Sequence, residues 1–511
     1  MDPDLLTRLA ARAASVAHGS GLSVAVPFTG ETLGTVPRAE GRDVAEAGER
    51  ARRAQEVWAE LPIAHRVRPL LRFHDLLLAR QEEVLDLIQL ESGKARGHAF
   101  EEVADVALVC RYYAYHAARL LRDRRRKGAF PGLTLTRETR RPVGVVGIIS
   151  PWNYPLSLSV SDAAPALVAG NAVLLKPDTQ GVFTALWAAA LLEEAGLPPG
   201  LLQILPGEGP ELGPPLIAAV DFLAFTGSTA TGRAVGARAA ERLIGCSLEL
   251  GGKNPMIVFA DARLQRAVAG ALRGCFSSAG QLCLSIERLY VQDAIHDAFL
   301  ERFLDRVRSL RMGAALDYTA DVGSLVSAAQ LRKVEAHVSD ALAKGATLLA
   351  GGRPRPDLGP YFYEPTVLSG VSEGMLVHSE ETFGPVVSVY PFSSTEEAVE
   401  LANRSSYGLN ASVWSSDLRF ARAVAARLRA GTVNVNDAYA AAWASVDAPM
   451  GGVGDSGVGR RHGAEGIRKY TEAQTISVQR LVTPGALGGR DRSATWLTRL
   501  LRGLRHLPGL R

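Results

Sequence analysis

The sequence has 511 residues, of which 47% are hydrophobic and 22% charged, and its formal net charge is +4. This composition is ordinary for a globular protein, and the length favours two or three domains. Residues 481–511 contain six Arg and one Asp, so the rest of the chain has a net charge of −1, which argues against a nucleic-acid-binding body. No apolar run reaches the roughly 18 residues of a membrane-spanning helix.

The four cysteines are few and their spacing is not that of a metal site: Cys110, Cys246, Cys275 and Cys283. The N-terminal residues lack the charged-then-apolar pattern of a secretory signal. We therefore expect a protein of the reducing cytoplasm, without disulfides and without a bound metal.

The first part of the chain is helical in pattern. Residues 43–60 and 64–125 are rich in Ala, Leu, Arg and Glu at helical spacing, which predicts several amphipathic helices. The basic run at 122–127 is compatible with a nucleic-acid patch. A charge run of this kind is more typical of a solvated turn, which is the interpretation that we favour.

Strands and helices then alternate. Residues 142–150 form an apolar, β-branched run that is typical of a strand buried on both faces of a parallel sheet. Further strands are predicted at 171–176, 201–205 and 222–225, with a helix at 182–195. This alternation predicts a doubly wound α/β sheet with a nucleotide at the carboxyl ends of its strands.

A phosphate-binding loop is predicted at 227–232, Gly-Ser-Thr-Ala-Thr-Gly, directly after a strand and at the start of a helix. Backbone N–H groups at a helix start attract phosphate. The loop differs from the common G-x-G-x-x-G pattern, and alone it is more typical of a turn with a helix cap.

A second α/β unit begins near residue 251. We predict its strands near 255–259, 287–291 and 385–391, and a Gly- and Pro-rich loop at 350–361. Residues 434–436 are predicted to end a strand, and the Gly-rich stretch 451–459 to form a flexible loop beside the substrate entrance.

Cys283 and Glu249 form the candidate catalytic pair. Cys283 follows a segment of small residues, and a reactive thiolate needs an electropositive, partly open setting and usually a nearby base. Glu249 lies 34 residues upstream in an apolar run, where desolvation raises a carboxyl pKa toward the range of a general base. The alternatives are an inert buried Cys and a Glu paired with an Arg.

Several motifs accompany this pair in a fixed order. They are Ser-Pro-Trp-Asn-Tyr-Pro at 150–155, Lys-Pro at 176–177, Phe-Thr-Gly-Ser-Thr at 225–229 and Glu-Glu-Thr-Phe-Gly-Pro at 380–385. With them the sequence resembles the NAD(P)-dependent aldehyde dehydrogenase superfamily over roughly residues 20–480. Within it, the sequence is most similar to NADP-dependent succinate-semialdehyde dehydrogenases of an actinobacterial type.

The resemblance implies a fold class and a domain plan. The fold is α/β, with a Rossmann-type cofactor domain and a catalytic domain, both doubly wound, and a small oligomerisation β-arm. The boundaries that it implies are 1–123 and 143–249 for the cofactor domain, 250–449 for the catalytic domain, 124–142 and 467–481 for the arm, and 482–511 for a basic tail. It also implies a homodimer or homotetramer.

The resemblance also assigns the chemistry. Cys283 attacks the aldehyde, Asn153 and the Cys283 N–H stabilise the oxyanion, and Glu249 activates the water that releases the acid. Among the cofactor contacts, Lys176 holds the adenosine ribose, Ser228 lies near the pyrophosphate, Glu381 binds the nicotinamide ribose and Phe383 packs on the nicotinamide. The full set of implied cofactor contacts is Trp152, Lys176, Thr179, Gly227, Ser228, Gly232, Leu250, Glu381 and Phe383.

Two positions depart from what such families often contain. Where NAD-preferring members often have Glu, this sequence has Thr179, whose hydroxyl suits a 2′-phosphate, so we favour NADP with NAD as the alternative. Where several succinate-semialdehyde dehydrogenases have Arg, it has Ser161, which leaves the substrate carboxylate without one expected partner. The alternatives are a broad medium- or long-chain aldehyde dehydrogenase and a non-catalytic relative that acts as a binding protein.

The C-terminal tail contains a predicted short amphipathic helix at 493–505. Its apolar face and its basic residues are Trp496, Leu497, Leu500, Leu501 and Leu504, and Arg499, Arg502 and Arg505. Such a helix can lie in an anionic membrane interface. The apolar face is small, so we favour packing on the enzyme body or on a partner subunit.

Overall fold

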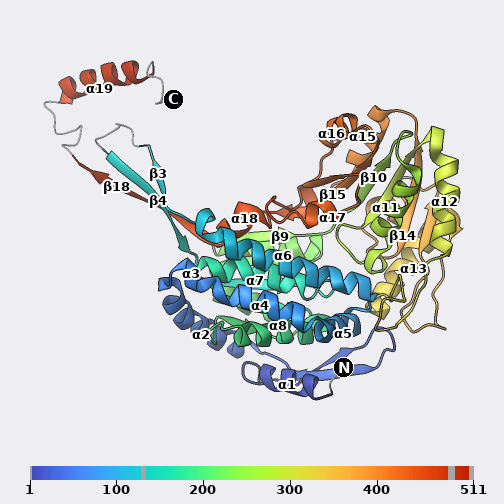
Figure 1. Ribbon diagram of the computed structural model, residues 1–511, viewed down its shortest axis with the longest axis horizontal. Helices are drawn as coiled ribbons and strands as arrows, with labels where there is room; N and C mark the ends of the chain where they lie inside the picture. The colour runs from blue at the N-terminus through green and yellow to red at the C-terminus, as the bar shows by residue number, and fades with distance from the viewer. Residues whose placement is uncertain (1–2, 128–133, 481–489, 506–511) are drawn as a thin grey trace. The chain divides into compact units, whose positions relative to one another are not determined.

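The computed structural model describes residues 3–127, 134–480 and 490–505, and it divides the chain into two compact units (Figure 1). The larger unit comprises Met1–Leu120 and Pro142–Tyr470, and the smaller one Leu121–Arg141 and Thr471–Arg511. Among the described residues, no helix is both long and apolar enough to cross a membrane.

The larger unit contains a six-stranded sheet with the strand order β17-β9-β8-β5-β6-β7. All neighbouring strands from β9 to β7 run parallel, and only β17 is antiparallel. The strands are β5 (Val145–Ser150), β6 (Ala172–Pro177), β7 (Leu202–Ile204), β8 (Phe222–Thr226), β9 (Gly245–Glu249) and β17 (Gly457–Val458). The four strands predicted from the apolar runs before residue 226 are confirmed.

The prediction of a flexible loop at 451–459 is wrong in part. Gly457 pairs with Glu249 and Val458 with Leu248, so this stretch adds strand β17 to the sheet edge at the candidate general base. The periodicity could not reveal the pairing because the strand is only two residues long.

The second sheet has seven strands in the order β12-β13-β14-β11-β10-β15-β16, parallel except for β12. Its strands are β10 (Asn254–Val258), β11 (Ile286–Gln292), β12 (Thr347–Ala350), β13 (Thr366–Ser369), β14 (Val386–Phe392), β15 (Asn410–Trp414) and β16 (Thr432–Val435). The strands predicted near 255–259, 287–291 and 385–391 are confirmed.

Alternate residues of strand β10 enter two different hydrophobic cores. Met256 and Val258 pack in the core shared with helices α11, α12 and α13, whereas Ile257 packs in the core shared with α15 and α16. This follows from the two-residue period of a strand. Helices therefore cover both faces of the second sheet (Figure 1).

The helices of the larger unit match the pattern of the sequence, including the predicted helix at 182–195. Region 64–125 is divided into α3, α4, α5 and α6. The helices are α1 (Pro3–Ala13), α2 (Gly41–Glu60), α3 (Ile63–Arg66), α4 (Arg68–Ala79), α5 (Gln81–Ser92), α6 (Arg96–Leu120), α7 (Ser157–Ala169), α8 (Val182–Glu194), α9 (Gly209–Ala219), α10 (Thr229–Glu241), α11 (Leu264–Phe276), α12 (His296–Arg308), α13 (Ala328–Ala343), α14 (Leu376–Ser379), α15 (Thr395–Asn403), α16 (Leu418–Ala425), α17 (Ala440–Trp443) and α18 (Gly463–Arg468). A hairpin of β1 (Gly21–Ala25) and β2 (Thr32–Pro37) lies near the N-terminus of the chain.

The smaller unit is a three-stranded sheet, β18-β4-β3, followed by helix α19. Its elements are β3 (Arg124–Arg126), β4 (Thr134–Pro142), β18 (Thr471–Gln479) and α19 (Arg490–Leu504). The prediction of a solvated turn at 122–127 is wrong for residues 124–126, which form strand β3. Within this strand, Arg124 pairs with Glu138 of β4. The helix predicted in the tail is confirmed, and Trp496 and Leu501 on it are exposed.

Candidate active site

Two adjoining cavities share one wall, and this wall carries the three predicted catalytic residues. Asn153, Glu249 and Cys283 line both cavities, together with Leu158 and Thr226. The carboxyl ends of the parallel strands β5, β8 and β9 supply or directly precede Asn153, Thr226 and Glu249. The structure therefore brings together residues that are 130 positions apart in the sequence.

A left-handed turn positions Cys283. Ser278, Ala279 and Gly280 have φ values of 52°, 54° and 71°. A Cβ added to Gly280 would lie 2.0 Å from the carbonyl oxygen of Gly384, so only glycine fits there. The Gln281 side chain fixes the turn by accepting the N–H of Val326 at 2.9 Å.

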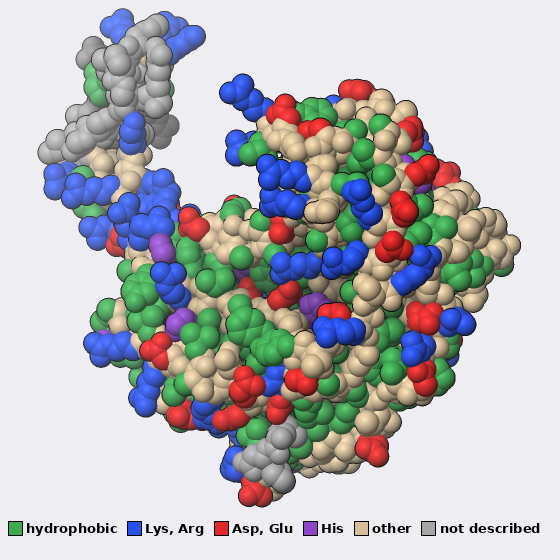
Figure 2. All heavy atoms as spheres, turned by 45° about the vertical axis from the view of Figure 1, so that its right-hand side comes forward, with side chains coloured by type: hydrophobic (Ala, Val, Ile, Leu, Met, Phe, Trp, Pro, Cys, Tyr) green, Lys and Arg blue, Asp and Glu red, His purple; other side chains and the backbone are tan. Residues whose placement is uncertain are grey.

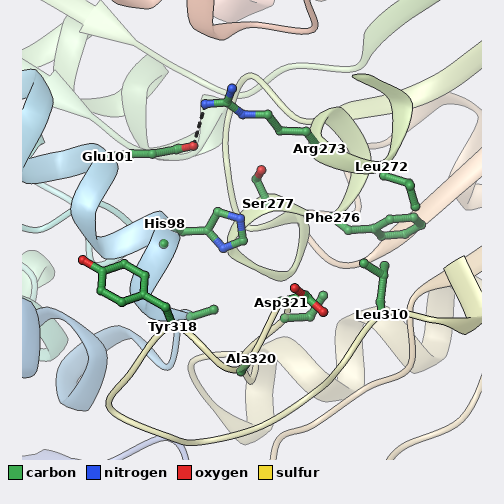
Figure 3. A pocket seen from close by; sticks show the side chains of 13 residues that line it. His98, Glu101, Leu272, Arg273, Phe276, Ser277, Leu310, Tyr318, Ala320 and Asp321 are labelled. Atoms are coloured by element: carbon green, nitrogen blue, oxygen red, sulfur yellow. Dashed lines mark hydrogen bonds and ion pairs between the residues drawn. The ribbon is translucent and has the colours of Figure 1, made fainter. Parts of the chain in front are cut away.

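Two further contacts hold Ser278 in this turn. His98 accepts the N–H of Ser278 through Nδ1 at 3.2 Å, and the hydroxyl groups of Tyr154 and Ser278 lie 2.9 Å apart. Figure 3 shows His98 beside Ser277 in a separate open cavity, across from the ion pair of Glu101 and Arg273.

The electrostatic setting of Cys283 differs from the prediction. Burial, together with the negative charges of Glu381 and Glu249, raises the pKa of the thiol to about 12. The expected electropositive surroundings are therefore wrong, since the two strongest charges that act on the thiol are negative. Glu381 is almost one hundred residues away in sequence, so its approach was not visible in the local pattern.

Glu249 agrees with the prediction of a desolvated carboxyl group. Its side chain is buried, and Oε1 has no hydrogen-bond partner. Burial raises the pKa of Glu249 to about 7, against the opposing charges of Arg461 and Lys469. A carboxylate paired directly with an Arg would be ionised well below this pH, so the geometry favours a group that exchanges protons near neutrality.

Asn153 presents a side-chain amide at the same wall. Its Nδ2 donates to the carbonyl oxygen of Gln281 at 3.0 Å, and its own backbone carbonyl accepts from Lys94 Nζ at 2.5 Å. An amide nitrogen has two N–H groups. The second N–H of Asn153 is therefore available to an oxygen atom beside Cys283.

The first cavity has the features of a dinucleotide site. It encloses about 200 Å³ and its lining includes Trp152, Gly227, Ser228, Leu250, Glu381 and Phe383. The Phe383 ring stands edge-on to Trp152 at 5.5 Å between centroids, and Glu381 accepts the N–H of Gly252 at 2.7 Å. Burial raises the pKa of Glu381 to about 7.

The predicted phosphate loop lies where helix α10 begins. Ser228 is the N-cap and accepts the N–H of Thr231 at 3.2 Å. A Cβ on Gly232 would lie 2.3 Å from Leu250, so glycine allows this side chain to pack against the helix. The loop combines a helix start with close packing, as a phosphate site requires.

Lys176 lies near the carboxyl end of β6, and Thr179 lies two residues after the strand ends. Lys176 is buried, and burial lowers its pKa, while the carboxylates of Asp178 and Glu208 oppose this shift. The hydroxyl of Thr179 donates to Glu208 Oε1 at 3.1 Å. The predicted hydroxyl donor therefore has an acidic partner that the sequence analysis did not identify.

The second cavity is mostly apolar, with a few polar groups. Ser161, which stands where an Arg was expected, donates to Asp105 Oδ2 at 2.8 Å. Trp443 Nε1 donates to Asp105 Oδ1 at 2.6 Å. Arg461, held by Asp162 at 2.8 Å, is the one Lys or Arg among the described residues of this lining.

Sequence reasoning missed several residues of both cavities. They are Asp105, Leu158, Gln330, Lys333, Trp443, Met450, Arg461 and His462. For Arg461 and His462 a signal existed, since Arg-Arg-His follows the Gly-rich stretch 451–459. The others come from helices and loops with no distinctive local pattern.

Comparisons with known proteins agree with this geometry. Residues 15–476 match the aldehyde dehydrogenase family. A putative succinate-semialdehyde dehydrogenase [NADP(+)] of Mycolicibacterium smegmatis is 51% identical, covering 94% of each chain. A 4,4'-diapolycopene aldehyde oxidase of Methylomonas is 42% identical, covering 87% of this chain and 83% of that protein.

A solved structure gives the same result for the fold. The crystal structure of a betaine aldehyde dehydrogenase point mutant from Staphylococcus aureus in complex with NAD+ superposes with a TM-score of 0.89. Its sequence is 33% identical, and the match covers 96% of this chain and 100% of the other. The chain therefore belongs to the aldehyde dehydrogenase family, as an NAD(P)-dependent enzyme that oxidises an aldehyde to the carboxylic acid.

Proposed function

We propose that the protein oxidises succinate semialdehyde to succinate with NADP, and with NAD as a second acceptor, through a covalent intermediate on Cys283. The observation that carries the covalent mechanism is the buried, unpartnered Oε1 of Glu249 in the wall that it shares with Cys283. The substrate and the cofactor are supported by the similarity to the putative succinate-semialdehyde dehydrogenase [NADP(+)] of Mycolicibacterium smegmatis.

The first half of the reaction takes place at Cys283. The Cys283 thiol, whose pKa is raised, first loses its proton to water, and the positive charge of bound oxidised cofactor would favour this ionisation. The thiolate then attacks the aldehyde carbon, and the carbonyl π electrons move to oxygen to give the oxyanion of a thiohemiacetal. The free N–H of Asn153 and the Cys283 N–H stabilise that oxyanion. Bound cofactor supplies the acceptor for the hydride that leaves the former aldehyde carbon, and a thioester remains on Cys283.

The second half depends on Glu249. With a pKa of about 7, Glu249 is ionised in about half of the molecules at neutral pH and can take a proton from water. The resulting hydroxide attacks the thioester carbon, the C–S bond breaks, and the acid and the Cys283 thiolate are released. Gly451 leaves room for the Glu249 carboxyl, since a Cβ at position 451 would lie 3.0 Å from Glu249 Oε1.

The cofactor fits the residues of the first cavity. Trp152 and Phe383 offer apolar faces to the nicotinamide, and Glu381 offers a carboxylate to ribose hydroxyls. Gly227, Ser228 and the start of α10 suit the pyrophosphate, with Gly232 and Leu250 packed behind them. Lys176 and Thr179 would hold the adenosine ribose, and Thr179 its 2′-phosphate.

The proposal includes the domain plan and the assembly. Residues 1–123 and 143–249 form the cofactor domain, 250–449 the catalytic domain, 124–142 and 467–481 an oligomerisation arm, and 482–511 a basic tail. We expect a homodimer or homotetramer built through the arm, which light scattering will distinguish. We place the enzyme in the cytoplasm, supported by the absence of disulfides among its four cysteines.

A medium- or long-chain aldehyde is the second candidate substrate. Apolar side chains dominate the second cavity, among them Leu158, Leu282, Leu284, Leu409 and Met450. The similarity to a 4,4'-diapolycopene aldehyde oxidase points the same way. Succinate semialdehyde is favoured by Arg461, a cation that can pair with the substrate carboxylate, and by the similarity to the Mycolicibacterium smegmatis protein.

Turnover of an aldehyde panel tests the proposal. We expect kcat/KM for succinate semialdehyde to exceed that for butanal, which has the same chain length without the carboxylate, and that for decanal. A preference for decanal would replace the substrate with the second candidate. No oxidation of any aldehyde with either cofactor would refute the function itself.

A further inference from the structure

The carboxylate of Glu208 occupies the place where the proposed cofactor site should be least acidic. Its Oε1 accepts the hydroxyl of Thr179 at 3.1 Å, and Thr179 is the group offered to the 2′-phosphate. Glu208 lies between β7 and α9, on the connection that follows the strand next to β6. Two neighbouring strand ends therefore place a hydroxyl and a carboxylate together.

The position of Glu208 in its own helix makes this contact notable. Glu208 is the N-cap of α9, where an acidic side chain commonly accepts an N–H of the first turn. Its side chain makes no such capping bond. It reaches instead across to Thr179, so the helix does not account for its orientation.

The charge of Glu208 also reaches Lys176. The carboxylates of Asp178 and Glu208 oppose the lowering of the Lys176 pKa that burial causes, and Glu208 contributes to the raised pKa of Asp178. Lys176, the residue assigned to the adenosine ribose, thus has two carboxylates near it. A 2′-phosphate would add two further negative charges to a group that is already acidic.

We propose that Glu208 is a cofactor-specificity residue that disfavours the 2′-phosphate of NADP and allows NAD to compete. The inference rests on the proposed function, because it assumes that the adenosine ribose lies at Lys176 and Thr179. A carboxylate accepts hydrogen bonds from ribose hydroxyls, whereas it repels a phosphate and holds the hydroxyl that a phosphate would use. The acidic group that NAD-preferring enzymes often carry at position 179 is here supplied from position 208.

The test compares Glu208→Gln with Glu211→Gln. Glutamine keeps the size of the side chain and removes its charge. Glu211 is a matched control, since it lies in the first turn of the same helix and pairs with Arg38 at 3.3 Å rather than with Thr179. The readout is the ratio of kcat/KM for NADP to kcat/KM for NAD, with one aldehyde at a fixed concentration.

We expect Glu208→Gln to raise this ratio about two- to fivefold, as for an exposed charge interaction, mainly through a lower KM for NADP, and Glu211→Gln to leave it unchanged. The rise should shrink in high salt, because Glu208 is exposed and its charge is screened. An unchanged ratio, a fall, or an equal change with both cofactors would overturn the assignment.

A binding measurement separates this inference from the proposed function. On the Cys283→Ala background, the Kd of each cofactor can be read from the quenching of tryptophan fluorescence, since Trp152 lines the first cavity. If wild-type protein oxidises no aldehyde, the function fails, and these constants still test Glu208. If aldehyde is oxidised and Glu208→Gln changes neither constant, only the role of Glu208 fails.

Discussion

The pH dependence of turnover follows from the environment of Glu249. With a pKa of about 7, this carboxyl is ionised to about one tenth at pH 6 and about nine tenths at pH 8. If hydrolysis of the thioester limits the rate, kcat should rise about tenfold between these values and then level off. Glu249→Gln has no ionisable group there, so its residual kcat should be flat over this range.

Stopped-flow absorbance of the reduced cofactor separates the two halves of the reaction. The first turnover of Glu249→Gln should still give a burst of one equivalent per active site, because Cys283 and Asn153 are intact. The steady rate that follows should fall by about 10²- to 10⁴-fold, as expected for loss of a general base. Loss of the burst would mean that Glu249 also acts before hydride transfer, and a rate unchanged by the substitution would refute its role.

Three further predictions concern single residues. Cys283→Ala should abolish aldehyde oxidation and keep cofactor binding. Cys275→Ala, which removes a fully buried thiol, should keep both oxidation and binding. If Cys283→Ala remained active and Cys275→Ala were inactive, the assignment of the nucleophile would be reversed. Thr179→Glu should weaken NADP more than NAD, measured as the change in each KM, because it adds a second carboxylate beside Glu208. Glu249→Gln should stabilise the fold at pH 8. Since the folded pKa of Glu249 is raised, the stability that its protonated form contributes is complete below the unfolded pKa of 4.5 and is lost as the pH rises through 7, a difference of about 3 kcal/mol. Thermal unfolding should thus show a larger gain in Tm over wild type at pH 8 than at pH 5, and equal gains would contradict the buried charge.

The strands could be predicted from the sequence because burial on both faces leaves a continuous apolar signal. The runs at 142–150 and 171–176 gave β5 and β6 within three residues. The direction of the pKa shift of Glu249 could also be anticipated, since a carboxyl inside an apolar run is expected to be buried and desolvated. Local patterns were sufficient wherever local burial decides the outcome.

The electrostatics of the site could not be predicted, because they depend on contacts between distant segments. Glu381 approaches Cys283 from a loop after α14, and Glu208 contacts Thr179 from the connection between β7 and α9. Ser161 gave the expectation of a missing substrate partner, whereas the structure shows it bound to Asp105. Each of these contacts joins residues that only the tertiary fold brings together.

Trapping the thioester tests the central claim most directly. Glu249→Gln is mixed with aldehyde and NADP, quenched in acid and digested with trypsin, which releases Gly274–Arg288 with both Cys275 and Cys283. The account predicts that this peptide gains the mass of one acyl group and that fragmentation places it on Cys283. An unmodified peptide in a variant that still reduces one equivalent of cofactor, or an acyl group on Cys275, would contradict the covalent mechanism at Cys283.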